Sequence, residues 1–179
     1  MLKKEDTVLV VVDVQGKLAQ LMYEREKLYK NLQKLIQSAK ILDLQIIWME
    51  QYPKGLGPTI PEIADLLPEL RPIPKMSFSC CGEGHFMASL NATNRNQILI
   101  SGIETHVCVH QTALDLIRLG FEVQIVSDAV SSRTKENKEI GLQKMAVAGA
   151  ILTSVEMALF ELLRVAGNTE FKEISKILK

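Results

Sequence analysis

The sequence lacks the features that would place a protein on nucleic acid or in a membrane. Its 21 basic and 21 acidic side chains give a formal net charge of zero, so no electrostatic attraction to nucleic acid or anionic lipid is expected. No apolar run approaches the roughly 20 residues that span a bilayer, and the first residues lack the apolar region of a signal peptide. We therefore expect a cytoplasmic protein that has neither nucleic acid nor a membrane as its partner.

Cysteine and histidine are scarce, with three residues of each. The cysteines are Cys80, Cys81 and Cys108, an odd number with no Cys-x-x-Cys spacing, which argues against a disulfide framework and a structural zinc site. Cys80 and Cys81 fit better as small core residues than as a strained bridge between neighbours. The histidines show no metal-ligand spacing either, so we expect no metal and no other cofactor.

Strand patterns alternate with helix patterns along the chain. The predicted strands are residues 7–13, 45–50, 97–103, 121–127 and 150–154. The predicted helices are residues 24–43, 83–90, 108–119, 135–148, 156–165 and 171–177. Gly120 is expected to close the helix before it, and Thr153 or Ser154 to cap a later one. This alternation predicts one α/β domain over residues 1–179, in three layers, with helices on both faces of a doubly wound parallel sheet.

All six prolines lie within residues 52–74. Proline removes a backbone donor and restricts the residue before it. We therefore predict a long loop here, with at most one short helix near residues 60–67. Loops of this length inside a compact domain are usually functional.

Three polar residues are expected at the carboxyl edge of the sheet. Asp13 follows the first strand, Cys108 follows the strand at 97–103, and Lys75 ends the proline-rich loop. In doubly wound sheets this edge binds ligands. A thiol at a helix N-terminus is also expected to have a lowered pKa, which would make it a better nucleophile.

These residue types suit nucleophilic catalysis. An aspartate can take the proton of a thiol and return it to a leaving group, and a lysine can hold both charges in place. Backbone N–H groups before Cys108 could stabilise an oxyanion. His106 and His110 suggest a histidine base instead, although His110 should point away from Cys108. Each residue also has a purely structural explanation, as a strand end, a solvated loop lysine or a small core residue.

Several segments carry a resemblance to a known family. They are Val-Val-Val-Asp13-Val-Gln15, Lys75 before Ser-Phe78-Ser, residues 101–109 (SGIETHVCV) and residues 126–133 (VSDAVSSR). Over nearly its full length the chain resembles the isochorismatase-like cysteine hydrolase superfamily. Residues 50–57 (EQYPKGLG) resemble its branch of isochorismatase-domain-containing proteins.

The resemblance implies a six-stranded parallel sheet, a homo-oligomer and a catalytic triad of Asp13, Lys75 and Cys108. It further implies a cis peptide between Ile103 and Glu104, with the backbone N–H groups of Glu104 and Cys108 forming an oxyanion hole. Gln15 and Phe78, which lie in the matching motifs, are candidates for the substrate pocket.

Two differences between this sequence and characterised members of the superfamily exclude possible activities. Residues 48–63 contain no histidine, whereas nicotinamidases of this superfamily carry an Asp/His metal cluster after the second strand. Members that cleave the vinyl ether of isochorismate lack the cysteine, so Cys108 argues against that reaction. Residues 80–85 are unusual for the family and leave the pocket shape open.

The leading hypothesis is a cysteine hydrolase of a small C–N bond (amide, carbamate or urea-type) or an ester. A second is a catalytically silent binding or scaffold module on the same fold. A third is thiol redox chemistry between Cys108 and Cys80 or Cys81.

Overall fold

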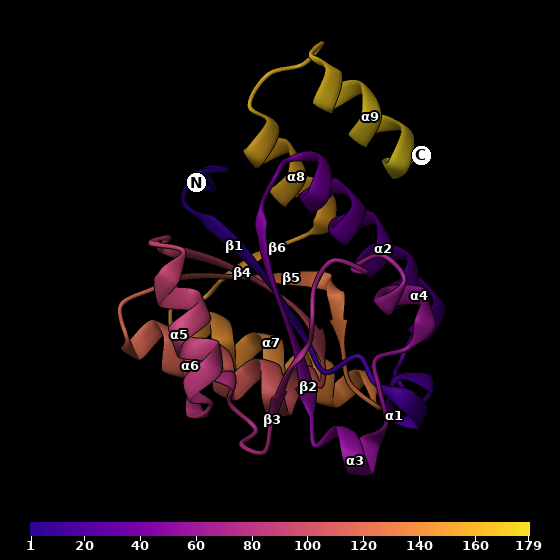
Figure 1. The fold of residues 1–179 in the computed structure, drawn as a ribbon, viewed down its shortest axis with the longest axis vertical. Helices are drawn as coiled ribbons and strands as arrows, with labels where there is room; N and C mark the ends of the chain where they lie inside the picture. The colour runs from indigo at the N-terminus through magenta and orange to yellow at the C-terminus, as the bar shows by residue number, and fades with distance from the viewer.

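The apolar run at the start of the sequence forms β1 at the middle of a six-stranded sheet. The computed structural model describes residues 1–179. Every strand pair is parallel, in the order β3-β2-β1-β4-β5-β6 (Figure 1). The strands are β1 (Thr7–Val12), β2 (Gln45–Gln51), β3 (Ile73–Lys75), β4 (Gln97–Ile103), β5 (Glu122–Ser131) and β6 (Ile151–Thr153). The strand order reverses between β1 and β4, which places the expected ligand crevice at their carboxyl ends.

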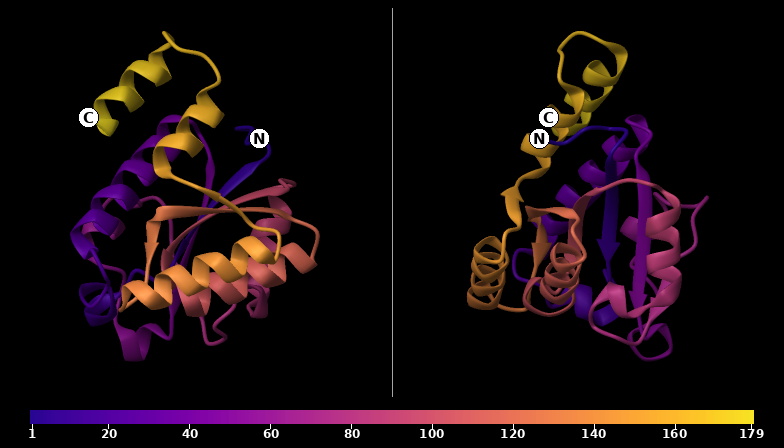
Figure 2. Two further views of the ribbon diagram at one scale, coloured as in Figure 1. Left: turned by 180° about the vertical axis from the view of Figure 1, so that it is seen from behind. Right: turned by 90° about the vertical axis from the view of Figure 1, so that its left-hand side faces the viewer.

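Helices cover both faces of this sheet (Figure 2). They are α1 (Gly16–Gln20), α2 (Arg25–Ile41), α3 (Pro53–Leu56), α4 (Pro61–Ala64), α5 (Gly84–Ala92), α6 (His110–Arg118), α7 (Lys135–Val147), α8 (Val155–Leu163) and α9 (Thr169–Leu178). The helices α2, α8 and α9 pack in one apolar cluster, and α5, α6 and α7 in a second on the opposite face. The predicted three-layer, doubly wound architecture is confirmed.

β1 contributes to both clusters. Leu9 and Val11 belong to the first, and Val8, Val10 and Val12 to the second, because successive side chains of a strand point to opposite faces. All six residues of β1 are buried. The continuous apolar run therefore marks a strand covered on both sides.

Gly102 in β4 allows the close approach of β4 to β1. Its φ is +109°, and a Cβ at this position would collide with the backbone of Val12. We expect Gly102→Ala to lower the free energy of unfolding by more than about 2 kcal/mol. The backbone strain of a side chain at positive φ adds to the cost of the collision between its Cβ and Val12. Urea unfolding measures this loss. Gly84→Ala is the control, since Gly84 has open space around it, and an equal effect of both changes would contradict the argument.

The structure differs from the sequence prediction mainly between residues 13 and 75. The short helix allowed near residues 60–67 is α4, but the predicted proline-rich loop also contains a second short helix, α3, and the edge strand β3. Pro74 is tolerated in β3 because an edge strand leaves one side of its backbone unpaired. The short helix α1 was not predicted either. These elements are a single turn or a few residues long, so tertiary contacts rather than periodicity determine them.

Two helix boundaries are also informative. The helix predicted from Cys108 begins earlier, as a π-helical turn over Thr105–Val109 that leads into α6. Ser154 caps α8, with its side chain accepting a hydrogen bond from the Met157 N–H. Gly120 follows α6 with a φ of +89°, as expected for a residue that ends a helix.

Candidate active site

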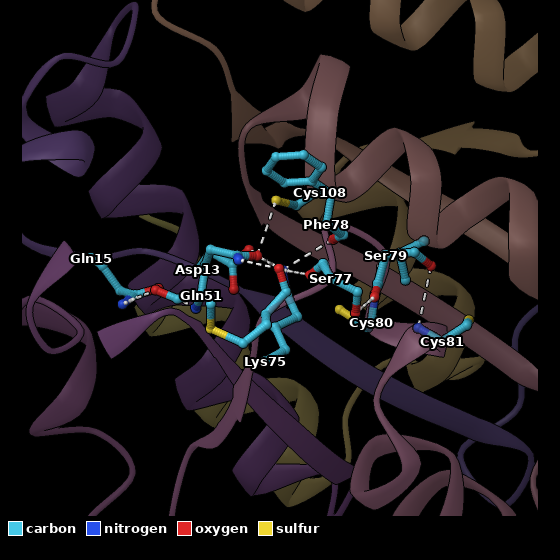
Figure 3. Close-up of polar contacts among 12 residues, drawn as sticks. Asp13, Gln15, Gln51, Lys75, Ser77, Phe78, Ser79, Cys80, Cys81 and Cys108 are labelled. Atoms are coloured by element: carbon cyan, nitrogen blue, oxygen red, sulfur yellow. Dashed lines mark hydrogen bonds and ion pairs between the residues drawn. The ribbon is translucent and has the colours of Figure 1, made fainter. Parts of the chain in front are cut away.

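The carboxyl edge of the sheet brings Asp13, Lys75 and Cys108 together (Figure 3). Asp13 directly follows β1, Lys75 is the last residue of β3, and Cys108 lies in the π-helical turn after β4. Three strands of one sheet thus position three side chains that lie far apart in the sequence. All three residues are buried, with at most 7% of their surface exposed.

The Lys75 ammonium is held on several sides. Its Nζ lies 2.7 Å from Asp13 Oδ2 and donates to Gln51 Oε1 at 2.6 Å. It also donates to the carbonyl oxygens of Phe78 at 3.0 Å and Ser77 at 3.2 Å. Burial alone would lower the pKa of Lys75, but the negative charge of Asp13, with a smaller contribution from the Cys108 side chain, raises it above its usual value. The lysine is therefore a fixed positive charge.

The Asp13 carboxylate has the properties of a base. Its backbone has a φ of +51°, and its N–H donates to the Met49 carbonyl at 3.2 Å. Burial raises the pKa of Asp13, and the ion pair with Lys75 opposes this only in part. Oδ1 is buried and takes no part in the ion pair, which Oδ2 makes with Lys75. One oxygen thus anchors the lysine while the other is available for a proton.

The pKa of the Cys108 thiol is raised, contrary to the expectation from its position near a helix N-terminus. Burial and the charge of Asp13 raise its pKa to about 12, although Lys75 acts in the opposite direction. Loss of hydration and the neighbouring carboxylate both disfavour the charged thiolate. A raised pKa favours the neutral thiol over the nucleophilic thiolate.

The buried ion pair predicts a pH-dependent stability defect in Lys75→Met. Removal of the ammonium leaves the Asp13 carboxylate buried without a counter-charge, which costs about 3–5 kcal/mol. The variant raises the Asp13 pKa further, and protonation of Asp13 at low pH relieves the penalty. Urea unfolding should therefore show a larger defect at about pH 8 than at about pH 5. A defect that is equal at both pH values would contradict this origin.

Glu104 is firmly held, and its backbone N–H is left free. The peptide bond between Ile103 and Glu104 is cis, as the family resemblance implied. The Glu104 carbonyl accepts from the N–H groups of Val107 and Val109, and its Oε1 accepts from Arg133 N and Nε, each at 3.1 Å. The Glu104 N–H donates to no protein acceptor. It remains available to a ligand.

The two pocket candidates are placed differently. Gln15 is fully buried, and its amide is bonded to main chain: Oε1 accepts from Gln51 N at 2.6 Å, and Nε2 donates to the carbonyls of Gln51 and Gly57. The Gln15 amide therefore fixes the backbone at the end of β2, and both of its polar atoms are already hydrogen-bonded. Phe78 is 55% exposed while its carbonyl holds Lys75. Its ring remains the candidate for a pocket wall.

Gln51 is the member of this cluster that sequence reasoning missed. It is the last residue of β2, at the same edge as Asp13 and Cys108, and its Oε1 lies 4.0 Å from Cys108 Sγ. The available signal was a polar residue at the carboxyl end of a buried strand. In the sequence, Gln51 entered only as part of the EQYPKGLG segment that carries the family resemblance, and no role was assigned to it.

The other two thiols and His106 take no part in the contacts of this cluster. Cys80 is fully buried in an apolar cluster, as predicted, and all three cysteines are free. His106 Nδ1 bonds Ser132 Oγ at 2.9 Å rather than Cys108. No group of three or more His, Cys, Asp or Glu side chains could hold a metal ion.

Cys108 is almost fully buried in the single chain. The residue is 7% exposed. Cys108 lines none of the five best-defined cavities, among them one of about 220 Å³ between α2, β5 and α7. Separately, no helix has the length and apolar character needed to cross a membrane.

The fold and the cluster define an α/β protein with a buried thiol, carboxylate and ammonium at the switch point of its sheet. The Isochorismatase domain model matches residues 7–157. The chain belongs to the isochorismatase family, and this membership supports hydrolase activity in general. The resemblance seen in the sequence is thereby confirmed.

Two sequence relatives have similar lengths. The secreted isochorismatase effector Isc1 of Phytophthora sojae is 40% identical over 97% of this chain and 84% of its own. Isochorismatase domain-containing protein 2 of Danio rerio is 36% identical over 99% of this chain and 89% of its own. Because one relative is named as secreted, a cytoplasmic location stays a prediction.

Solved structures agree closely with the fold. A protein named MAR1 ribonuclease from Caenorhabditis elegans is 36% identical, with a TM-score of 0.92 over 99% of this chain and 91% of its own. YcaC from Escherichia coli, described as an octameric hydrolase of unknown specificity, is 27% identical, with a TM-score of 0.92 over 98% and 89%. YcaC from Pseudomonas aeruginosa, described with covalent acrylamide, is 26% identical, with a TM-score of 0.92 over 98% and 90%.

Proposed function

We propose that the protein hydrolyses a small C–N bond (amide, carbamate or urea-type) or an ester through a thioester on Cys108. The observation that carries this proposal is the buried ion pair of Asp13 and Lys75 beside the Cys108 thiol. The carboxylate has a raised pKa, and its Oδ1 takes no part in the ion pair with Lys75. These are the properties required of a base that takes a proton from a buried thiol.

The first step forms the thioester. Asp13 takes the thiol proton as Cys108 Sγ attacks the carbonyl carbon, and the carbonyl electron pair moves onto its oxygen. The backbone N–H groups of Glu104 and Cys108 stabilise that oxyanion. The oxyanion then collapses, the bond to nitrogen or oxygen breaks, and protonated Asp13 gives its proton to the leaving group.

The second step releases the acid. Asp13, again a carboxylate, takes a proton from water, and the resulting hydroxide attacks the thioester carbonyl. The carbon–sulfur bond breaks, and the thiolate recovers the proton from Asp13. Lys75 keeps its charge throughout and pairs with whichever neighbour is negative. The net reaction adds one water and yields an acid and an amine or alcohol.

The relatives support this proposal. The E. coli relative is described as a hydrolase, and the P. aeruginosa relative as carrying covalent acrylamide, which fits a fold with a reactive group. The E. coli protein is also described as octameric. We propose that this chain too forms a homo-oligomer, through exposed apolar side chains near its C-terminal helices such as Ile151, Met157 and Phe160.

The test is a screen of purified protein against small amides, ureas, carbamates and esters, with ammonia or acid release as readout. Turnover that disappears in Cys108→Ala supports the proposal. Binding of a compound without turnover would favour the scaffold alternative. Cleavage of RNA, suggested by the name of the C. elegans relative, would leave no acyl group on Cys108 and would contradict the proposed reaction.

A further inference from the structure

The side chain of Gln51 joins the lysine and the thiol of the site, and the reaction steps above do not use it. Gln51 Oε1 accepts a hydrogen bond from Lys75 Nζ at 2.6 Å and lies 4.0 Å from Cys108 Sγ. No other side-chain oxygen outside the proposed triad contacts both groups. Gln51 is 9% exposed, so these contacts are shielded from water.

The orientation of this amide is determined by its surroundings. Nε2 of Gln51 donates to the Met76 carbonyl at 2.8 Å, which leaves Oε1 facing the ammonium. The backbone of Gln51 is also fixed, because its N–H donates a hydrogen bond to the Gln15 side chain and its carbonyl accepts one from it. The reversed amide would place two donors against the ammonium and an acceptor against a carbonyl. The oxygen therefore stays directed at Lys75 and Cys108.

We infer that Gln51 is a positioning residue that holds Lys75 still while the negative charge of the site moves from Asp13 to Cys108. The inference rests on the proposed proton transfer. Before the transfer, Lys75 pairs with the Asp13 carboxylate; after it, Asp13 is neutral and the sulfur carries the charge. The neutral amide oxygen holds the ammonium equally in both states.

The neutrality of residue 51 is the essential property. A carboxylate at position 51 would form its own ion pair with the Lys75 ammonium and would add a negative charge close to Cys108 Sγ. Like charges at this distance in a buried site oppose each other strongly. The chain therefore has an acceptor that fixes the lysine without competing with the thiolate for its charge.

The test is the pH dependence of iodoacetamide labelling of Cys108 in the full-length protein. Trypsin releases Cys108 on peptide 96–118 and the other two cysteines on peptide 76–95, so mass spectrometry follows Cys108 alone. We expect Gln51→Glu to move the labelling profile to higher pH by at least about one unit, roughly tenfold slower labelling at a given pH. Gln51→Met, which has no acceptor for Lys75, should move it in the same direction by less.

Gln124 provides matched controls. It is a buried glutamine in β5 whose Oε1 has no hydrogen-bond partner, so Gln124→Glu and Gln124→Met should label like the wild type. A folded Gln51→Glu or Gln51→Met protein with the wild-type profile would overturn the inference, because a merely structural role changes stability and not the labelling pH. If Gln51→Glu does not fold, Gln51→Met alone decides. A shifted profile in a protein that cleaves no substrate would contradict the proposed function and not the positioning role.

Discussion

Cys108→Ala is expected to abolish turnover of every amide, carbamate or ester that the wild-type protein cleaves, a loss of at least about 10³-fold. The reason is that Cys108 is the only nucleophile next to Asp13 and Lys75 that can carry the acyl group in the proposed reaction. The exchange removes one buried sulfur atom and should cost only about 1 kcal/mol of stability. Ammonia or acid release measures the activity, and circular dichroism verifies the fold.

Cys81→Ala is the matched control for this loss. Cys81 is a half-buried thiol whose pKa burial raises to about 11, and it takes no part in the proposed steps. The control should keep full activity. Substantial turnover by Cys108→Ala would rule out the covalent route. An internal disulfide after mild peroxide treatment would instead favour the redox alternative.

Asp13→Asn is expected to separate thiol reactivity from catalysis. Hydrolysis should fall by about 10³-fold, because asparagine cannot take the thiol proton or return it to the leaving group. The labelling of Cys108 should nevertheless become faster at a given pH. The charge of Asp13 raises the Cys108 pKa and the charge of Lys75 lowers it, so removal of the carboxylate leaves the lysine to stabilise the thiolate.

The two readouts must move in opposite directions. Iodoacetamide labelling of peptide 96–118 over a range of pH locates the thiol pKa, and product release measures hydrolysis. Asp6 is half-buried and pairs with Lys3 at the opposite end of β1 from Asp13. The variant Asp6→Asn is therefore the control, and both its labelling profile and its rate of hydrolysis should match those of the wild type. A labelling profile that stays in place or moves to higher pH in Asp13→Asn would show that Asp13 does not act on the thiol.

The order of strands and helices could be predicted because the periodicities are local and long. Residues 7–12 form one continuous apolar run, and α2 repeats its apolar side chains at three- and four-residue steps. The ends of such strands then position Asp13 and Cys108 at one edge. The rule that ligands bind at this edge connects them with Lys75, although β3 itself was not predicted.

Three features of the site could not be predicted from the sequence because they depend on tertiary packing. The edge strand β3 has three residues, one of them proline, and gives no periodic signal. The raised pKa of Cys108 comes from burial and from Asp13, whereas the sequence shows only a position near a helix start. The amide contacts of Gln15 and Gln51 depend on how the ends of β1 and β2 meet.

The most direct test of the account is detection of an acyl group on Cys108 during turnover. The protein is mixed with an activated ester such as p-nitrophenyl acetate, quenched in acid and digested with trypsin. The account predicts that peptide 96–118 of the wild type carries the acyl group, which disappears as the ester is consumed, and that Cys108→Ala carries none. Steady turnover with peptide 96–118 unmodified at every quench time would contradict it.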